Sequence, residues 1–134
     1  MTKLVEIEGI GETYAAKLQA AGVTSLENLL EKGSTKKGRK ALEDATGISG
    51  KLVLRWVNMA DLFRIKGIGE QYSDLLEAAG VDTVPELAQR KADNLHAKMA
   101  EVNEKKKLVR ALPALASVEK WVASAKELPR VVTY

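Results

Sequence analysis

One stretch near the start of the chain occurs again in its second half, and these two stretches decide the fold. Residues 4–23 read LVEIEGIGETYAAKLQAAGV, and residues 62–81 read LFRIKGIGEQYSDLLEAAGV. Extended to residues 4–29 and 62–87, they align at a constant offset of 58 with 13 of 26 positions identical. Self-similarity of this extent indicates an internal repeat. We therefore expect two related units, at residues 1–61 and 62–134.

Each copy carries Gly-Ile-Gly directly before an amphipathic helix. The four glycines Gly9, Gly11, Gly67 and Gly69 lie where the chain must turn tightly between two helices, a conformation that often needs positive φ or close backbone approach. Valine at Gly11 or Gly69 should therefore destabilise the fold. The following helices end at glycines that are typical C-terminal stops. This layout is typical of a helix-hairpin-helix motif.

The remainder of the first copy also has helical spacing. Thr24 or Ser25 should cap a helix that ends near Lys32, and residues 35–45 should form a third helix that ends at Thr46-Gly47. Ile48-Ser49 then resembles a second, degenerate hairpin, with Ser49 capping a helix that continues to residue 63.

The second copy repeats this plan more loosely. Residues 107–109 match residues 51–53, whereas Trp121 matches Trp56 only with seven additional residues, an insertion in which residues 112–114 would form a turn or a helix start. The tail after Leu128 leaves the helix at a proline and should be extended and partly frayed. We predict an all-α fold of two tandem helix-hairpin-helix repeats of short helices, packed into one compact unit.

Composition excludes several classes of protein. No apolar run approaches the roughly 20 residues of a membrane span, and the first residues show no signal peptide. The chain has no cysteine and a single histidine, His96, to which we assign no chemical role. We therefore expect a cytoplasmic protein without a membrane, metal or other cofactor. Trp56, Trp121, Tyr14 and Tyr72 fit a core better than a platform for stacked bases.

Charge is distributed unevenly along a chain of net charge +3 and pI about 9.1. Residues 4–31 carry one basic and five acidic side chains, and residues 62–89 carry two and five. The connecting regions are the reverse, since residues 32–55 carry seven basic and two acidic side chains, and residues 98–110 carry five and two. Each copy is thus acidic at its Gly-Ile-Gly turn and basic at its weaker hairpin.

The residues resemble a bacterial family of tandem helix-hairpin-helix proteins described as a domain of unknown function. The first copy, with EGIGETYAAKLQAAGVTSLENLLEKG and ATGISGKLVLRWV, is also similar to the small N-terminal domains of archaeal recombinases. The wider superfamily implies non-specific DNA binding, in which backbone N–H groups of the hairpin hold a phosphate at a helix N-terminus. Carried over, these positions are Gly9, Ile10 and Gly11, with Gly67, Ile68 and Gly69. Here, however, Glu12 and Glu70 follow the second glycine and would repel a phosphate.

Two hypotheses and one plain alternative follow. The first is a binder of double-stranded DNA, independent of sequence, that uses the basic connectors and contacts phosphates. Its candidate residues are Lys36, Lys37, Arg39, Lys40, Gly47, Ser49, Gly50, Lys51 and Arg55 in the first copy, and Lys105, Lys106, Lys107 and Arg110 in the second. The other is a protein-interaction module or homo-oligomer in which acidic and basic faces meet. The plain alternative is that the runs of charged residues on these helices are solvent-exposed faces without a partner.

An enzyme is the least favoured class. The carboxylates fall at cap and solvent positions, with no cluster of histidine, cysteine or metal-ligand spacing beside them. Gly9-Ile10-Gly11 lacks the third glycine and the preceding strand of a dinucleotide-binding loop, and no Gly-Lys-Ser/Thr follows it. We therefore expect no catalytic residue and no small-molecule substrate.

Overall fold

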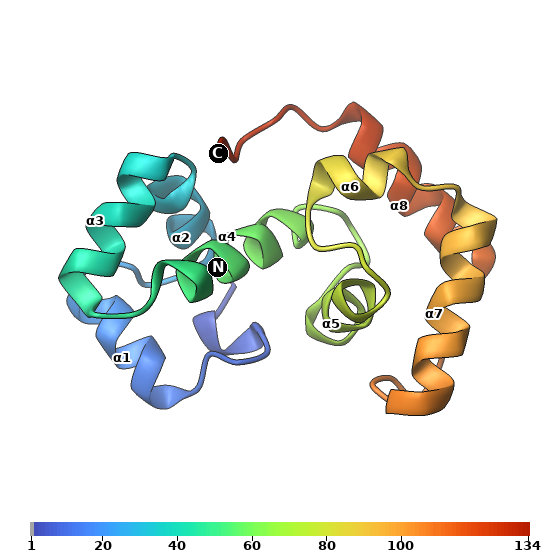
Figure 1. Ribbon diagram of the computed structural model, residues 1–134, viewed down its shortest axis with the longest axis horizontal. Helices are drawn as coiled ribbons and strands as arrows, with labels where there is room; N and C mark the ends of the chain where they lie inside the picture. Colours follow the sequence, from blue (N-terminus) through green and yellow to red (C-terminus); the bar gives the residue numbers. More distant parts are fainter. Residues whose placement is uncertain (1) are drawn as a thin grey trace. The chain divides into compact units, whose positions relative to one another are not determined.

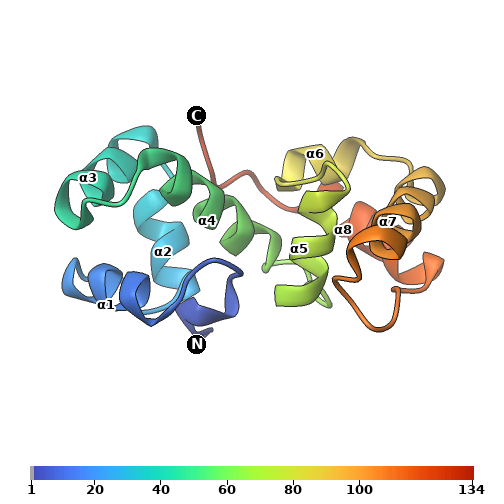
Figure 2. The same cartoon turned by 60° about the horizontal axis from the view of Figure 1, so that its bottom comes forward.

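The chain is entirely helical in the computed structural model, which describes residues 2–134. Within these residues there are eight α-helices, one short 3-10 helix and no strand (Figures 1 and 2). The elements are η1 (Leu4–Glu6), α1 (Glu12–Ala20), α2 (Leu26–Gly33), α3 (Lys36–Thr46), α4 (Gly50–Leu62), α5 (Glu70–Ala78), α6 (Val84–Gln89), α7 (Ala92–Lys106) and α8 (Leu115–Glu127). The all-α prediction is confirmed.

The chain divides into two compact units. Unit 1 comprises the residues up to Asp61 together with Arg130–Tyr134, and unit 2 comprises Leu62–Pro129. In unit 1, α3 packs against α1 and α2; in unit 2, α8 packs against α6 and α7, and α7 also packs against α5. The repeat in the sequence assigns the last five residues to the second copy, whereas here they complete unit 1. The packing of the two copies on one another stays a prediction.

The helices of the two units correspond in order, and two pairs of them also have equal lengths. Helices α1 and α5 each have nine residues and begin directly after Gly-Ile-Gly. Helices α4 and α8 each have 13 residues and carry a tryptophan, Trp56 or Trp121, at the seventh position. The offset of 65 between the tryptophans therefore contains the repeat spacing plus the seven additional residues expected from the sequence.

Local sequence signals explain where the helices begin and end. Ser25, Thr35 and Thr83 each accept a hydrogen bond from the backbone N–H three residues later, which caps α2, α3 and α6. Helix α1 ends at Gly22, whose φ is +89°, and the N–H of Val23 donates to the carbonyl of Leu18 over 2.8 Å. This six-to-one bond is the Schellman ending that favours glycine.

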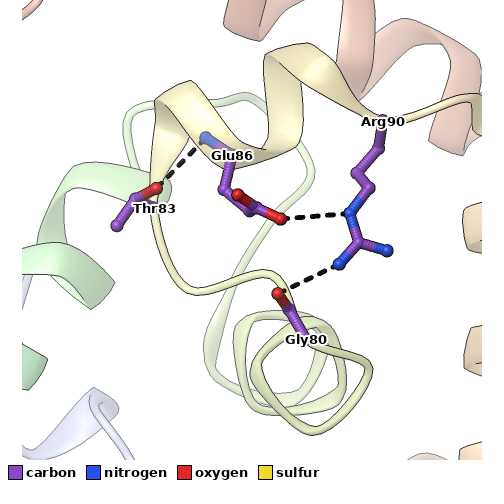
Figure 3. A network of polar contacts seen from close by, with 4 residues as sticks. All are labelled: Gly80, Thr83, Glu86 and Arg90. Atoms are coloured by element: carbon purple, nitrogen blue, oxygen red, sulfur yellow. Dashed lines mark hydrogen bonds and ion pairs between the residues drawn. The ribbon is translucent and has the colours of Figure 1, made fainter.

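The same ending occurs after α5 and is tied to α6 by one arginine. Gly80 has a φ of +97°, and its carbonyl accepts a hydrogen bond from Arg90 Nη2 over 3.2 Å. Arg90 Nε also donates to Glu86 Oε1 over 3.2 Å, as Figure 3 shows. Since Thr83 Oγ1 accepts from the N–H of Glu86, one network joins the start of α6, its end and the glycine before it.

Each unit has an equivalent aromatic core. Trp56 is fully buried and lies edge-on to Tyr14, with ring centroids 5.1 Å apart. Trp121 is 4% exposed and its ring centroid lies 5.3 Å from that of Tyr72. The prediction that these aromatics form the core, and not a platform for bases, is confirmed for both indoles.

Two local predictions were wrong. Residues 107–109 do not correspond to residues 51–53, because the latter lie inside α4 whereas the former follow α7 in a loop. Lys107 has a φ of +50° at the C-terminal cap of α7, so it corresponds to Gly47 at the end of α3. The tail is also not frayed, since the N–H of Thr133 donates to the carbonyl of Ser34 over 2.7 Å and Val132 is buried.

Candidate nucleic-acid interface

The two Gly-Ile-Gly turns share one backbone conformation. The first glycine is left-handed, with φ of +99° at Gly9 and +96° at Gly67. The second glycine is the N-terminal cap of the next helix, and its φ of −87° at Gly11 or −116° at Gly69 suits any residue. The expectation of a strained second glycine was therefore wrong, because only the first glycine makes the reversal of direction. The isoleucine between them is buried in both turns.

The amides of these turns are only partly available to a phosphate. The N–H of Ile10 donates to the carbonyl of Ile7, and that of Ile68 donates to the carbonyl of Ile65, each over 3.1 Å. The first residue of the following helix is an exposed glutamate in both cases. Because a carboxylate there interacts favourably with the helix dipole, it occupies the electrostatic position that a phosphate would take.

A third turn, at residues 47–49, resembles these turns in part, although the N–H of Ile48 donates to Thr46 Oγ1 and not to a backbone carbonyl. Gly47 has a φ of +74°, Ile48 is 2% exposed, and Ser49 stands where the other turns have their second glycine. The N–H of Leu52 donates to Ser49 Oγ over 3.3 Å, so Ser49 caps α4. The degenerate hairpin expected from the sequence therefore shares with the Gly-Ile-Gly turns a left-handed glycine, a buried isoleucine and a cap for the next helix.

The N-terminus of α4 differs from those of α1 and α5 in its charge. Its first two residues are Gly50 and Lys51, whose amides lie in the first turn of the helix and have no partner within it. One carboxylate lies nearby: Glu43 Oε2 is 2.9 Å from the position that a Cβ on Gly50 would occupy. A phosphate at this helix end would meet Lys51 and also this glutamate.

Four lysines of the candidate set are exposed: Lys36 and Lys37 begin α3, Lys40 lies in its second turn, and Lys51 lies in the first turn of α4. Lys36 and Lys40 line a groove of about 390 Å³ between α3 and α4, and this groove reaches Gly50. Lys40 Nζ lies 3.2 Å from Asp44 Oδ1, and this hydrogen bond and the negative charge raise the pKa of Lys40 above its ordinary value. Lys40 therefore stays cationic but already has a counterion in Asp44.

Both arginines of the unit 1 candidate set have structural roles. Arg39 is 8% exposed, and its guanidinium donates to the carbonyls of Gly33, over 2.9 Å, and Thr133, over 2.7 Å. Arg55 donates from Nη1 to the carbonyl of Glu8 over 2.9 Å, across the first Gly-Ile-Gly turn. The sequence analysis assigned both arginines to the DNA surface because the sequence does not show which backbone carbonyls lie near them in the fold.

The second basic cluster lies at the end of α7 and in the loop after it. Lys105, Lys106, Lys107 and Arg110 are all exposed. Lys105 Nζ lies 4.0 Å from Glu101 Oε1, and lysines in the last turn of a helix complement its dipole. Lys105 and Lys106 therefore have a local explanation in the last turn of α7.

Unit 2 also contains a groove that the sequence analysis missed. It has a volume of about 730 Å³ and lies between the turn at Gly67, the loop before α8, and α8 itself. Lys66 and Lys120 line it, and both are exposed. The sequence did indicate a difference between the units at this place. The residues aligned with Lys66 and Lys120 are Glu8 and Arg55, so unit 2 has two positive charges where unit 1 has one positive and one negative charge.

Other chemistry has little support in the described residues. His96 Nε2 lies 2.9 Å from the carbonyl oxygen of Pro113, which fits the packing role expected for this histidine. Among residues 2–134, no group of three or more histidine, cysteine or acidic side chains could hold a metal ion. None of the helices described is both long enough and apolar enough to cross a bilayer.

Comparison with known protein families identifies the family to which this chain belongs. A family model described as Domain of unknown function (DUF4332) matches residues 8–128. The chain belongs to the DUF4332 family. The expected membership in a family of unknown function is thereby confirmed, and the matched DUF4332 region spans both units. No match was found among curated proteins or solved structures.

Proposed function

We propose that this DUF4332 chain is a non-enzymatic helix-hairpin-helix module that binds double-stranded DNA without regard to its sequence. The surface proposed is the turn at residues 47–49, the N-terminus of α4 and the exposed lysines Lys36, Lys37 and Lys51. The observation that supports the proposal is that this turn has a left-handed glycine and a buried isoleucine, as the Gly-Ile-Gly turns do, but is followed by a lysine, and not a glutamate, in the first turn of the next helix.

Electrostatics favour this turn over the other two. At α1 and α5 an incoming phosphate meets Glu12 or Glu70, and at 4 Å two like charges near a protein surface repel each other by about 4 kcal/mol. At α4 the helix dipole and Lys51 both attract a phosphate, and Glu43 opposes it. Contacts of lysines and backbone amides with phosphate carry no sequence information, so binding should not depend on the sequence of the duplex.

A salt-dependent titration of duplexes of different sequence tests the proposal. Wild-type protein should bind them with similar affinities that fall steeply as salt increases. Replacement of Lys36, Lys37 and Lys51 by glutamine should weaken binding to all of them and reduce the salt slope by about one unit for each phosphate that is no longer bound. The matched control replaces the exposed lysines Lys17, Lys91 and Lys126, which removes the same charge elsewhere and should change the slope little.

A second pair of substitutions distinguishes the turns. Glu12→Lys with Glu70→Lys should leave affinity nearly unchanged beyond the effect of net charge if the third turn is the binding site. A clear gain in affinity, larger than that of two lysines added elsewhere, would instead assign binding to the Gly-Ile-Gly turns. Wild-type protein without salt-sensitive DNA affinity, even near 50 mM salt, would refute DNA binding by either surface.

A further inference from the structure

The loop before α8, residues 107–114, forms a fixed wall of the larger groove. Asn103 bonds both backbone groups of Val109, over 3.1 and 3.0 Å, at the start of the loop. Further along, Tyr72 donates from its hydroxyl to the carbonyl of Ala111 over 3.3 Å, and His96 Nε2 contacts the carbonyl of Pro113. The loop is therefore held against α5 and α7, yet Leu112 stays 38% exposed on the wall of the groove.

In unit 1 the side chain of Arg55 occupies the corresponding place. Arg55 reaches across the turn to the carbonyl of Glu8, and its Nη1 atom lies 3.1 Å from the position of a Cβ on Gly9. In unit 2 the aligned residues are Lys120 and Lys66. Two exposed ammonium groups thus line the groove where unit 1 has an arginine beside a glutamate. Glu127 is the single acidic side chain among the lining residues of this groove.

A segment of complementary character lies on unit 1. Residues 5–8, which we name the acidic segment, carry Val5 with 45% of its surface exposed and the exposed carboxylates Glu6 and Glu8. Val5, Leu112, Leu115 and Tyr134 are the large hydrophobic side chains that the described structure leaves exposed. An exposed apolar side chain followed by two exposed carboxylates therefore matches a groove with an exposed leucine and two lysines.

We propose that the groove of unit 2 binds the acidic segment of a second copy of this chain. Val5 would contact Leu112, and the carboxylates would face Lys66 and Lys120. Each copy has one groove and one acidic segment, so the contact is heterologous and can continue head to tail into a ring or filament. The buried area is small, so a weak and salt-sensitive association is expected.

Single swaps between aligned positions test this contact with little risk to the fold. Lys66→Glu introduces the residue that unit 1 has at its aligned position, and Glu8→Lys introduces the residue of unit 2. Wild-type protein should show a mass above that of the monomer that rises with concentration in sedimentation equilibrium and falls with salt. Each single variant should raise the dissociation constant about tenfold or more.

Complementation gives the sharper result. A mixture of the Lys66→Glu and Glu8→Lys variants should associate more strongly than either variant alone, because the lysine of one segment meets the new glutamate of the other groove. Lys91→Glu changes the same charge on an exposed residue outside the groove and should leave association unchanged.

Two results would overturn the assignment. One is a wild-type protein that remains monomeric at all concentrations tested. The other is a monomeric protein in which Lys66→Glu weakens DNA binding and lowers its salt slope, since the groove would then be a DNA contact. Neither of these two results depends on Lys36, Lys37 or Lys51. Failure of self-association and failure of the proposed DNA surface are therefore separate outcomes.

Discussion

The two glycines of each Gly-Ile-Gly turn should respond in opposite ways to the same substitution. Gly9 has a φ of +99°, where a residue with a Cβ costs about 1–3 kcal/mol. Its new Cβ would also lie 3.1 Å from Arg55 Nη1 and 3.6 Å from Trp56 Nε1. Gly11 has an ordinary φ of −87°, and no atom lies within 4 Å of its Cβ position among the described residues.

Serine is the informative replacement because Ser49 already occupies the second position of the third turn. Gly9→Ser should destabilise unit 1 by about 1–3 kcal/mol through backbone strain. Gly11→Ser should be neutral or stabilise by a few tenths of a kcal/mol, since serine is at least as good an N-terminal cap as glycine. Gly67→Ser and Gly69→Ser should repeat this contrast in unit 2.

Tryptophan fluorescence can report on the unfolding of each unit. The chain has two tryptophans, Trp56 in unit 1 and Trp121 in unit 2, so a Trp121→Phe background makes fluorescence in urea report on unit 1. With a slope of about 1–2 kcal/mol per molar urea, the Gly9→Ser midpoint should fall by about 0.5–3 M. A Gly9→Ser midpoint equal to that of the parent, with a lower one for Gly11→Ser, would refute this account of the turn.

Four further substitutions test the packing. Trp56→Ala and Trp121→Ala should each lower the free energy of unfolding by about 3–5 kcal/mol, because both indoles are buried, and a smaller decrease measured in urea would contradict their place in the core. Arg39→Ala should cost about 2–3 kcal/mol by removing the charged donor to two carbonyls, and Arg39→Gln should recover part of this in thermal unfolding. Gly33→Ala places a Cβ against Val57 Cγ2 and should cost about 1–3 kcal/mol; if Val57→Ala does not relieve this destabilisation in the double variant, the close approach of α2 to α4 is wrong.

Local sequence determined most of the secondary structure. Caps such as Ser25 and Ser49, and the glycines Gly22, Gly47 and Gly80, act within a few residues of their own position, so their spacing fixes where helices begin and end. The repeat also predicted that Trp56 and Trp121 would be equivalent despite the insertion. These features could be read without knowing which helices touch.

Tertiary structure decided which basic residues remain available to a partner. Arg39 resembles its neighbours Lys37 and Lys40 in the sequence, but it is buried because its guanidinium reaches a carbonyl 94 residues away. Arg55 is held by a carbonyl 47 residues away, whereas Lys120 at the aligned position lines an open groove. Charge patterns along the chain cannot separate such residues, because a guanidinium is withdrawn from solvent only when folding brings distant backbone acceptors within hydrogen-bond distance.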